Sequence, residues 1–303
     1  MPSKKRLKTT APTEGAESRL LVSYAFDLAR KLDISKLLVL ADLLQDRRTV
    51  ENHRKDESII WVVRGEGTTD KIPMRRGDHL IEIPTTKVDR MDQVKLGLVM
   101  AAFKDAISVE DSVVCLAGAA GSKRLDNLLI ANVKRDFPWF AKRKMETTAP
   151  LFSSREFVRL LEIALRFATE GREGKPIGTA FVLGDPESLQ SYTRPLILNP
   201  CAGHPRKCRQ VQNPEFLETL RELASLDGAF IVDRRGVVDS AGVYLDAPLT
   251  KKVVVPDGLG SRHTAAAALS AKTDALVIVI SESSGSVTVF SEGAATLQVH
   301  RSK

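Results

Sequence analysis

The chain has 303 residues, of which 43% are hydrophobic and 27% charged, so it can bury a sizeable core and is not disordered overall. This length predicts about two domains. Forty-five Lys and Arg residues against 38 Asp and Glu residues give a net charge of +7, which suits an anionic partner, either phosphate ligands or nucleic acid.

The cysteines and the apolar runs indicate where the protein works. Cys115, Cys201 and Cys208 are too few for a disulfide framework, and their odd number favours a reducing compartment. No signal peptide precedes the first apolar segment, and no apolar run approaches the ~18 consecutive residues of a membrane span. We therefore expect a cytoplasmic protein without a membrane partner.

The first half of the chain predicts an α/β domain from residue 16 to residue 140. Residues 1–15 are basic and polar and are expected to form a disordered tail, with nucleic-acid binding as the less favoured interpretation. Beyond the tail, helical spacing of apolar residues alternates with short, uniformly apolar runs. Helices are predicted over residues 17–32, 43–57 and 91–107, and strands over residues 36–41, 59–63, 80–84, 112–118 and 128–131. This alternation predicts a largely parallel sheet that is buried on both faces.

Two stretches of this half invite a functional interpretation. The loop 118–123 contains two glycines and a lysine after a strand, but it lacks the spacing of a phosphate-binding loop, and we predict a plain turn. In residues 134–153, basic side chains surround Phe137, Trp139 and Phe140 and the apolar periodicity lapses. We interpret that stretch as the domain boundary, although aromatics among basic residues can also stack single-stranded bases.

The second domain, residues 141–303, is predicted to be α+β. Ser154 is a predicted N-cap for a helix that ends at residue 171, and Asn213 with Pro214 is predicted to start a helix over residues 215–226. Other predicted elements are a strand over residues 178–183, an extended segment 195–200, a hairpin of residues 228–233 and 237–245, a helix over residues 265–271 and a strand over residues 275–280. Cys201, His204 and Cys208 offer three soft zinc ligands without a nearby fourth, so a surface loop is the preferred interpretation.

Three short segments of this domain carry residues that could bind a ligand or a metal ion. Asp227 comes where a helix gives way to a strand, and Gly228 after it allows backbone to approach a ligand; a carboxylate there can hold a divalent cation that bridges phosphates. Alone, this pair is only a turn signal. The small residues 240–242 interrupt the second hairpin strand, which indicates a bulge or a close ligand approach.

The third segment runs from Gly258 to Thr264. A flexible loop there leads into an Ala-rich helix, and the N–H groups and dipole of a helix start favour anions. Arg262 can grip a phosphate through two hydrogen bonds, and Thr264 adds a neutral donor. For this segment alone, a capped helix with an exposed Arg-His pair is the preferred interpretation. Glu282, after the last predicted strand, is ambiguous in the same way.

Taken together, these segments resemble the catalytic domain of diadenylate cyclases. The matching motifs, in order and spacing, are Asp227-Gly228-Ala229, Ala241-Gly242 with Leu245, Gly260-Ser261-Arg262-His263-Thr264, and Ser281-Glu282 with Gly285. Residues 178–184 and 194–200 look like the earlier strands of that domain, so the resemblance covers roughly residues 150–300. An α/β domain before the cyclase domain is similar to the archaeal-type soluble branch, whose first domain resembles the C-terminal domain of pyruvate kinase.

The resemblance implies condensation of two ATP molecules into cyclic di-AMP, with release of two pyrophosphates, at a site that two facing protomers of a homo-oligomer complete. Asp227 would bind Mn²⁺ or Mg²⁺ and help to activate the attacking hydroxyl, with Glu282 as a second metal ligand. Leu245 and its strand would lie against adenine, and the triphosphate would be held by the Arg-His-Thr cluster. The full set implied to bind ATP is Gly228, Ala229, Gly242, Leu245, Gly260, Ser261, Arg262, His263, Thr264 and Ser281.

The sequence also departs from the family pattern. Ser283 and Ser284 follow Glu282 where many members carry a second acid, which weakens the metal-binding role of Glu282, and Ser261 stands where threonine is common. The chain ends at Lys303, so neither the helix-hairpin-helix DNA-binding region of the DNA-scanning branch nor a membrane anchor is implied. The alternative function is a nucleotide-binding or sensing module of the same fold without turnover.

Overall fold

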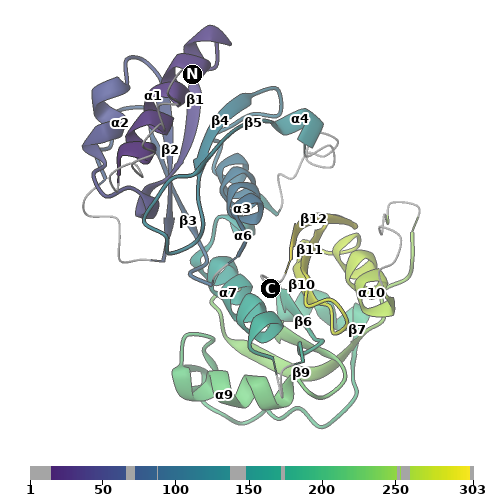
Figure 1. Ribbon diagram of the computed structural model, residues 1–303. Helices are drawn as coiled ribbons and strands as arrows, with labels where there is room; N and C mark the ends of the chain where they lie inside the picture. The colour runs from purple at the N-terminus through teal and green to yellow at the C-terminus, as the bar shows by residue number, and fades with distance from the viewer. Residues whose placement is uncertain are drawn as a thin grey trace, which may run out of the picture.

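The computed structural model describes residues 15–300, except 66–71, 87, 137–147, 172–174, 251–252 and 254–259. The predicted tail 1–15 therefore lies almost wholly outside the described residues, as do the aromatic residues at 137–140 and the predicted domain boundary at 140. The described residues form two β-sheets, each with its own helices (Figure 1). The predicted α/β architecture is confirmed.

The first sheet has five strands in the order β3-β2-β1-β4-β5. Its strands are β1 (Lys36–Leu40), β2 (Ser58–Arg64), β3 (His79–Ile83), β4 (Ser112–Ala117) and β5 (Asn127–Asn132). All neighbours pair in parallel except β5, which runs antiparallel to β4. Helix α1 (Ala16–Lys31) and helix α3 (Arg90–Phe103) cover opposite faces of this sheet (Figure 1). The central strands β1, β2 and β4 are mostly apolar and buried on both faces, as predicted, whereas the edge strands β3 and β5 are only partly buried.

The predicted helix over residues 43–57 is wrong in extent. The structure has a 3₁₀ turn at Ala41–Leu43 and a short helix α2 at Arg48–His53. Arg54 leaves the helix because its guanidinium pairs with Asp78 in the buried interior, and its Nε donates to the Glu57 carbonyl at 2.8 Å. A buried charge must be paired, and this requirement overrides the local helix preference. Helix α3 also ends four residues before its predicted limit, ahead of Asp105, which has a positive φ of 55°.

The second sheet has seven strands in the order β12-β11-β10-β6-β8-β9-β7, and only β6 and β8 pair in parallel. Its strands are β6 (Ala180–Leu183), β7 (Thr193–Pro195), β8 (Ala229–Val232), β9 (Val238–Leu245), β10 (Leu276–Ile280), β11 (Val287–Ser291) and β12 (Ala294–Val299). Helix α7 (Arg155–Thr169) packs on one face and helix α10 (Ser261–Ser270) on the other (Figure 1). Further helices among the described residues are α4 (Val133–Asp136), α6 (Ala149–Phe152), α8 (Pro186–Leu189) and α9 (Pro214–Leu223), with 3₁₀ turns at Gln190–Tyr192 and Arg206–Arg209. The predicted mixed sheet flanked by helices is confirmed.

Local signals account for several of these elements. The Ser154 side chain accepts from the Phe157 N–H at 3.1 Å, and Asn213 accepts from the Glu215 N–H at 3.1 Å, so both predicted N-caps are confirmed. The hairpin β8–β9 is also confirmed. The extended segment predicted over residues 195–200 is shifted, because the strand that joins the sheet there is Thr193–Pro195. The hairpin β11–β12 was not predicted.

Strand β9 contains a bulge at its small residues. Ala229 pairs with Val243, but Ile231 pairs with Ser240, so β9 has one more residue than β8 between these pairs. Gly242 lies between these two pairs with a φ of 67°, a backbone conformation that residues with a side chain rarely adopt. The bulge that the run 240–242 predicted is therefore present.

The two sheets are joined by packed contacts rather than by the chain alone. Phe103 of α3 stacks on Phe152 of α6 with ring centroids 3.8 Å apart, and the His300 N–H after β12 donates to the buried Asp92 carboxylate at 2.7 Å. The buried core continues from one sheet to the other. Across the described ranges we find no helix with the length and apolarity that crossing a membrane requires.

Candidate functional site

A pocket of about 1010 Å³ opens at one end of the second sheet. At this end β6 and β8 begin, β9 and β10 finish, and α10 starts. Its volume is at the upper end of the range of about 300–1,000 Å³ found for small-molecule sites. The predicted site residues that line it are Asp227, Gly228, Ala229, Leu245, Gly260, Ser261, Arg262, His263, Ser281 and Glu282. Gly242 and Thr264 do not.

Two glycines allow the backbones of β8 and β9 to meet at the base of the pocket. Gly228 has a φ of 108°, and a Cβ there would lie 2.7 Å from the Gly242 carbonyl carbon and the Val243 nitrogen. A Cβ on Gly242 would lie 2.5 Å from a side-chain carbon of Ile197. Gly242 thus shapes the pocket from behind, by allowing close packing, and is not part of its surface.

Helix α10 places Arg262 and His263 in its first turn. The helix begins at Ser261, four residues before the predicted start, with Gly260 as its N-cap. The His263 and Thr264 N–H groups both donate to the Gly260 carbonyl, which leaves the Ser261 and Arg262 N–H groups outside the helical ladder. Thr264 Oγ1 also bonds back to Gly260, at 3.5 Å. Thr264 therefore contributes to the helix start, while the residues before it face the pocket.

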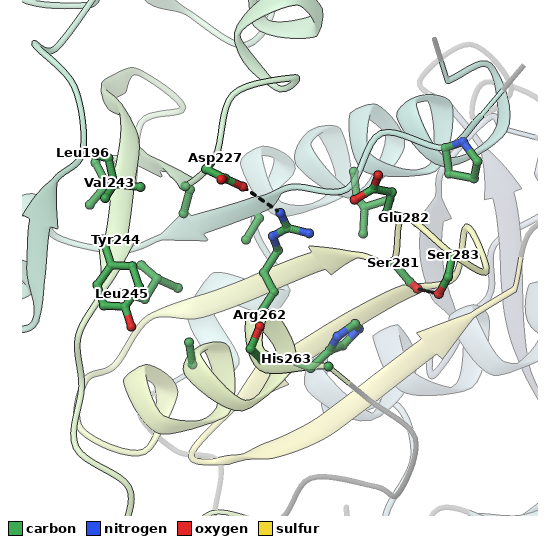
Figure 2. Close-up of a pocket in the computed structure, with 18 of the residues that line it drawn as sticks. Leu196, Asp227, Val243, Tyr244, Leu245, Arg262, His263, Ser281, Glu282 and Ser283 are labelled. Carbon is green, nitrogen blue, oxygen red and sulfur yellow. Dashed lines mark hydrogen bonds and ion pairs between the residues drawn. The ribbon is translucent and has the colours of Figure 1, made fainter. Parts of the chain in front are cut away.

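Arg262 lies between two carboxylates. Its Nη2 is 3.6 Å from Asp227 Oδ1, and Figure 2 shows Asp227 on one side of the guanidinium and Glu282 on the other. The Asp227 side chain is 92% exposed. An exposed ion pair at this distance contributes only about 0–1 kcal/mol to stability, so either side chain can leave this pair to bind a ligand at little cost in free energy.

His263 is the buried polar group of the pocket wall. It is 5% exposed, packs edge-on against Phe290, and its Nε2 has no hydrogen-bond partner among the described residues. Burial, and then the positive charge of Arg262, lower the pKa of His263 below its ordinary value. The imidazole is therefore neutral at pH 7 and offers a neutral donor or acceptor.

This buried imidazole predicts a loss of stability in acid. Since the folded state holds the pKa of His263 below the unfolded value of about 6.5, the unfolded state binds more protons between these values. The stabilisation is fully present above pH 6.5 and is lost as the pH falls below it. We expect the melting temperature of His263→Gln to fall less between pH 7.5 and pH 5.5 than that of wild type. Parallel curves for the two proteins would contradict this, and His204→Gln, on an exposed loop, is the control.

The opposite wall of the pocket is apolar. It is formed by Ala180, Ala229, Val243 and Leu245, all of them buried, with Leu196 and Tyr244 at the rim (Figure 2). The guanidinium of Arg194 stacks over the Tyr244 ring at 4.3 Å. Sequence reasoning named only Leu245 and Ala229 of this wall. Val243 was available from the alternation along the strand, whereas Ala180, Lys175 and Ser283 join the pocket only through the tertiary fold.

The acidic side chains of the pocket bear on metal binding. Asp227 and Glu282 are both oxygen donors on the pocket surface, which suits a hard divalent cation that takes its other ligands from phosphate and water. In the ranges that the structure describes, no three His, Cys, Asp or Glu side chains gather as a metal cluster. Residues 201–208 lie within the described ranges, and their three soft ligands do not form such a cluster; Cys201 is buried and Cys208 is exposed.

Comparison with known proteins relates the chain to diadenylate cyclases. Residues 166–295 match the family model described as "DisA bacterial checkpoint controller nucleotide-binding". The chain is 32% identical over 242 residues to a diadenylate cyclase of Methanocaldococcus jannaschii, covering 79% of this chain and 77% of the relative. It is 29% identical over 228 residues to a diadenylate cyclase of Haloferax volcanii, covering 73% and 80%. A solved structure from Bacillus cereus, described as a hypothetical membrane spanning protein, is 22% identical with a TM-score of 0.37, over 55% of this chain and 76% of that one.

The fold and the pocket define a mixed α/β protein whose pocket has one charged side and one apolar wall. The chain belongs to the diadenylate cyclase family. An alignment of 242 residues is longer than the stretch from residue 141 to residue 303, so the likeness to the Methanocaldococcus protein extends to residues before 141.

Proposed function

We propose that the protein condenses two ATP molecules into cyclic di-AMP and two pyrophosphates, at a site that two facing protomers complete. The observation that carries this proposal is the meeting of Asp227, Arg262 and Glu282 from three separate segments, at one side of a pocket whose opposite wall is apolar. A nucleoside triphosphate has the same polarity, with an apolar base at one end and charged phosphates at the other. Family membership supports the same substrate.

The phosphate end of the pocket is formed by the start of α10. Arg262 provides charged donors, and the Ser261 and Arg262 N–H groups at the helix start are available to an anion. His263 offers a buried Nε2 that has no hydrogen-bond partner among the described residues. The proposed roles of these residues are to hold the triphosphate and to balance its charge. The base would lie against Val243 and Leu245 on the apolar wall.

The acidic residues are proposed to hold Mn²⁺ or Mg²⁺. Asp227 would be the principal ligand and Glu282 the second, because both carboxylates reach the pocket surface. When bound, the ion would neutralise charge on the reacting phosphate. The reaction requires no protein nucleophile, because the attacking group is the 3′-hydroxyl of the substrate, and it can therefore proceed by positioning and charge balance. In this proposal Asp227 also withdraws the proton from the attacking 3′-hydroxyl.

A single pocket is proposed to hold one ATP, so the reaction requires a second copy of the chain. Each 3′-hydroxyl must reach the α-phosphate of the other nucleotide, and the exposure of Asp227 leaves its carboxylate open toward a facing protomer. The two pockets would then face each other across a two-fold axis.

The test is incubation of the protein with ATP and Mn²⁺, followed by chromatography of the products. We expect cyclic di-AMP to form, with two pyrophosphates released for each cyclic di-AMP. We also expect activity per protomer to fall on dilution through the range where light scattering shows dissociation. Unchanged activity per protomer where only monomer is present would refute the facing-protomer site. Tight ATP binding without any product would instead favour the non-catalytic nucleotide-binding module.

A further inference from the structure

Gly178 lies beside the pocket, between the lining residues Pro176 and Ala180 in the chain and next to the side chains of Arg262 and Glu282. A Cβ built on Gly178 would lie 2.6 Å from Glu282 Cβ, 2.9 Å from Arg262 Nη1 and 3.2 Å from Glu282 Oε2. A single methyl group at this position would therefore meet both side chains. The absence of a side chain creates the narrow gap across which the guanidinium and the carboxylate face each other.

The backbone around Gly178 is fixed from both sides. The carbonyl of Thr179 accepts from the Ile280 N–H at 2.9 Å, and the Thr179 hydroxyl donates to the Gly228 carbonyl at 3.4 Å. These bonds tie the entry of β6 to β10 and to the residue after Asp227. A methyl group on Gly178 therefore cannot be accommodated by moving β6 away, and the strain falls on its neighbours.

The two neighbours respond differently to such strain. Arg262 Nη1 is the end of a flexible side chain and can swing aside. Glu282 Cβ is one bond from the backbone, in a turn closed by the Gly285 N–H to Ser281 carbonyl bond at 2.8 Å and the Ser281 N–H to Ser286 carbonyl bond at 2.9 Å. Glu282 can move only if this turn moves with it.

From this geometry we propose that Gly178 is a positioning residue of the pocket, which sets the separation between the Arg262 guanidinium and the Glu282 carboxylate. The inference rests on the proposed function, since it gives both side chains a role with nucleotide and metal. It also restores a role to Glu282 that its sequence context placed in doubt. An error of about 1 Å in such a separation lowers rates by up to about 10²-fold.

The test compares Gly178→Ala with Gly184→Ala, at the two ends of the same strand. A Cβ on Gly184 would lie 2.9 Å from Ala275 Cβ, a similar crowding that lies away from the pocket. We expect Gly178→Ala to lower kcat tenfold or more and to shift the Mn²⁺ concentration for half-maximal activity at least threefold. For Gly184→Ala we expect reduced thermal stability with kcat within twofold of wild type. Equal losses of kcat in the two variants, or a Gly178→Ala enzyme with wild-type kcat and Mn²⁺ dependence, would overturn the proposal.

A double-mutant cycle with Glu282→Gln separates positioning from simple loss of fold. If Gly178 acts through Glu282, Gly178→Ala lowers kcat by much less in the Glu282→Gln background than in wild type. Full additivity of the two effects would contradict the inference.

Calorimetry with a non-hydrolysable ATP analogue and Mn²⁺ provides a readout that does not require turnover. If wild type forms no cyclic di-AMP but Gly178→Ala still binds the analogue at least threefold more weakly than Gly184→Ala does, the proposed function fails and the positioning role stands; equal binding would refute both.

Discussion

Replacing Asp227 with Asn is expected to lower the rate of cyclic di-AMP formation by about 10²–10³-fold, the loss typical of removing one group that balances charge in the transition state. The substitution keeps the size of the side chain and removes its negative charge, and with it the proposed metal ligand and proton acceptor. Since the side chain is 92% exposed and its ion pair with Arg262 is long, the free energy of unfolding should change by less than about 0.5 kcal/mol. Product chromatography and thermal melting measure the two effects separately.

The matched control for this substitution is Asp239→Asn. Asp239 is an exposed acid on β9 that does not line the pocket, and its substitution should leave the rate within twofold of wild type. Equal rates for Asp227→Asn and wild type would refute the role of Asp227. Equal losses in both variants would instead indicate a dependence on overall surface charge.

Gly228→Ala is expected to destabilise the protein by about 2–5 kcal/mol and to abolish cyclic di-AMP formation at temperatures where wild type is folded. Two costs add here. Gly228 has a φ of 108°, which is strained for any side chain, and the new Cβ would lie 2.7 Å from backbone atoms of β9 that cannot rotate away. Denaturant unfolding gives the free energy, and calorimetry with an ATP analogue reports on the pocket.

Gly203→Ala separates these two costs. Gly203 also has a positive φ, of 77°, but a Cβ there meets nothing within 4 Å. Its destabilisation measures the conformational cost alone, and the excess in Gly228→Ala measures the contact with β9. A Gly228→Ala protein no less stable than Gly203→Ala would show that the strands separate easily at this point.

The sequence predicted most of the architecture because local signals and tertiary packing agree there. Uniformly apolar strands, the Ser154 cap and the β8–β9 hairpin each follow from short-range patterns that the packed sheets reinforce. The helix predicted over residues 43–57 failed because Arg54 bonds with Asp78, a partner 24 residues away that no local pattern reveals. The β11–β12 hairpin was missed although its turn, at Glu292 and Gly293, follows an alternating polar and apolar run.

The sequence could predict which motifs form the candidate site, but not how exposed each residue is or what it bonds with. Family resemblance named Asp227 and Arg262, and the structure brings them to the same pocket with Glu282. It could not reveal that Thr264 bonds back into its own helix, that Gly242 lies behind the wall, or that burial keeps His263 neutral. These properties depend on the register and depth of packing, which spacing along the chain does not encode.

The bulge in β9 makes the apolar wall depend on the number of residues in the strand as well as on their identity. Val238 and Ala241 pack into the core on the α7 side, whereas Val243 and Leu245 pack on the α10 side with the pocket. In an uninterrupted strand, residues 241, 243 and 245 would share one face. The extra residue therefore reverses which side chains face each side of the sheet after the bulge. Val243 and Leu245 face the pocket, and Tyr244 faces outward. Deletion of one residue here would exchange the two faces and direct Tyr244 inward, so it would change the apolar wall of the pocket more than any single substitution.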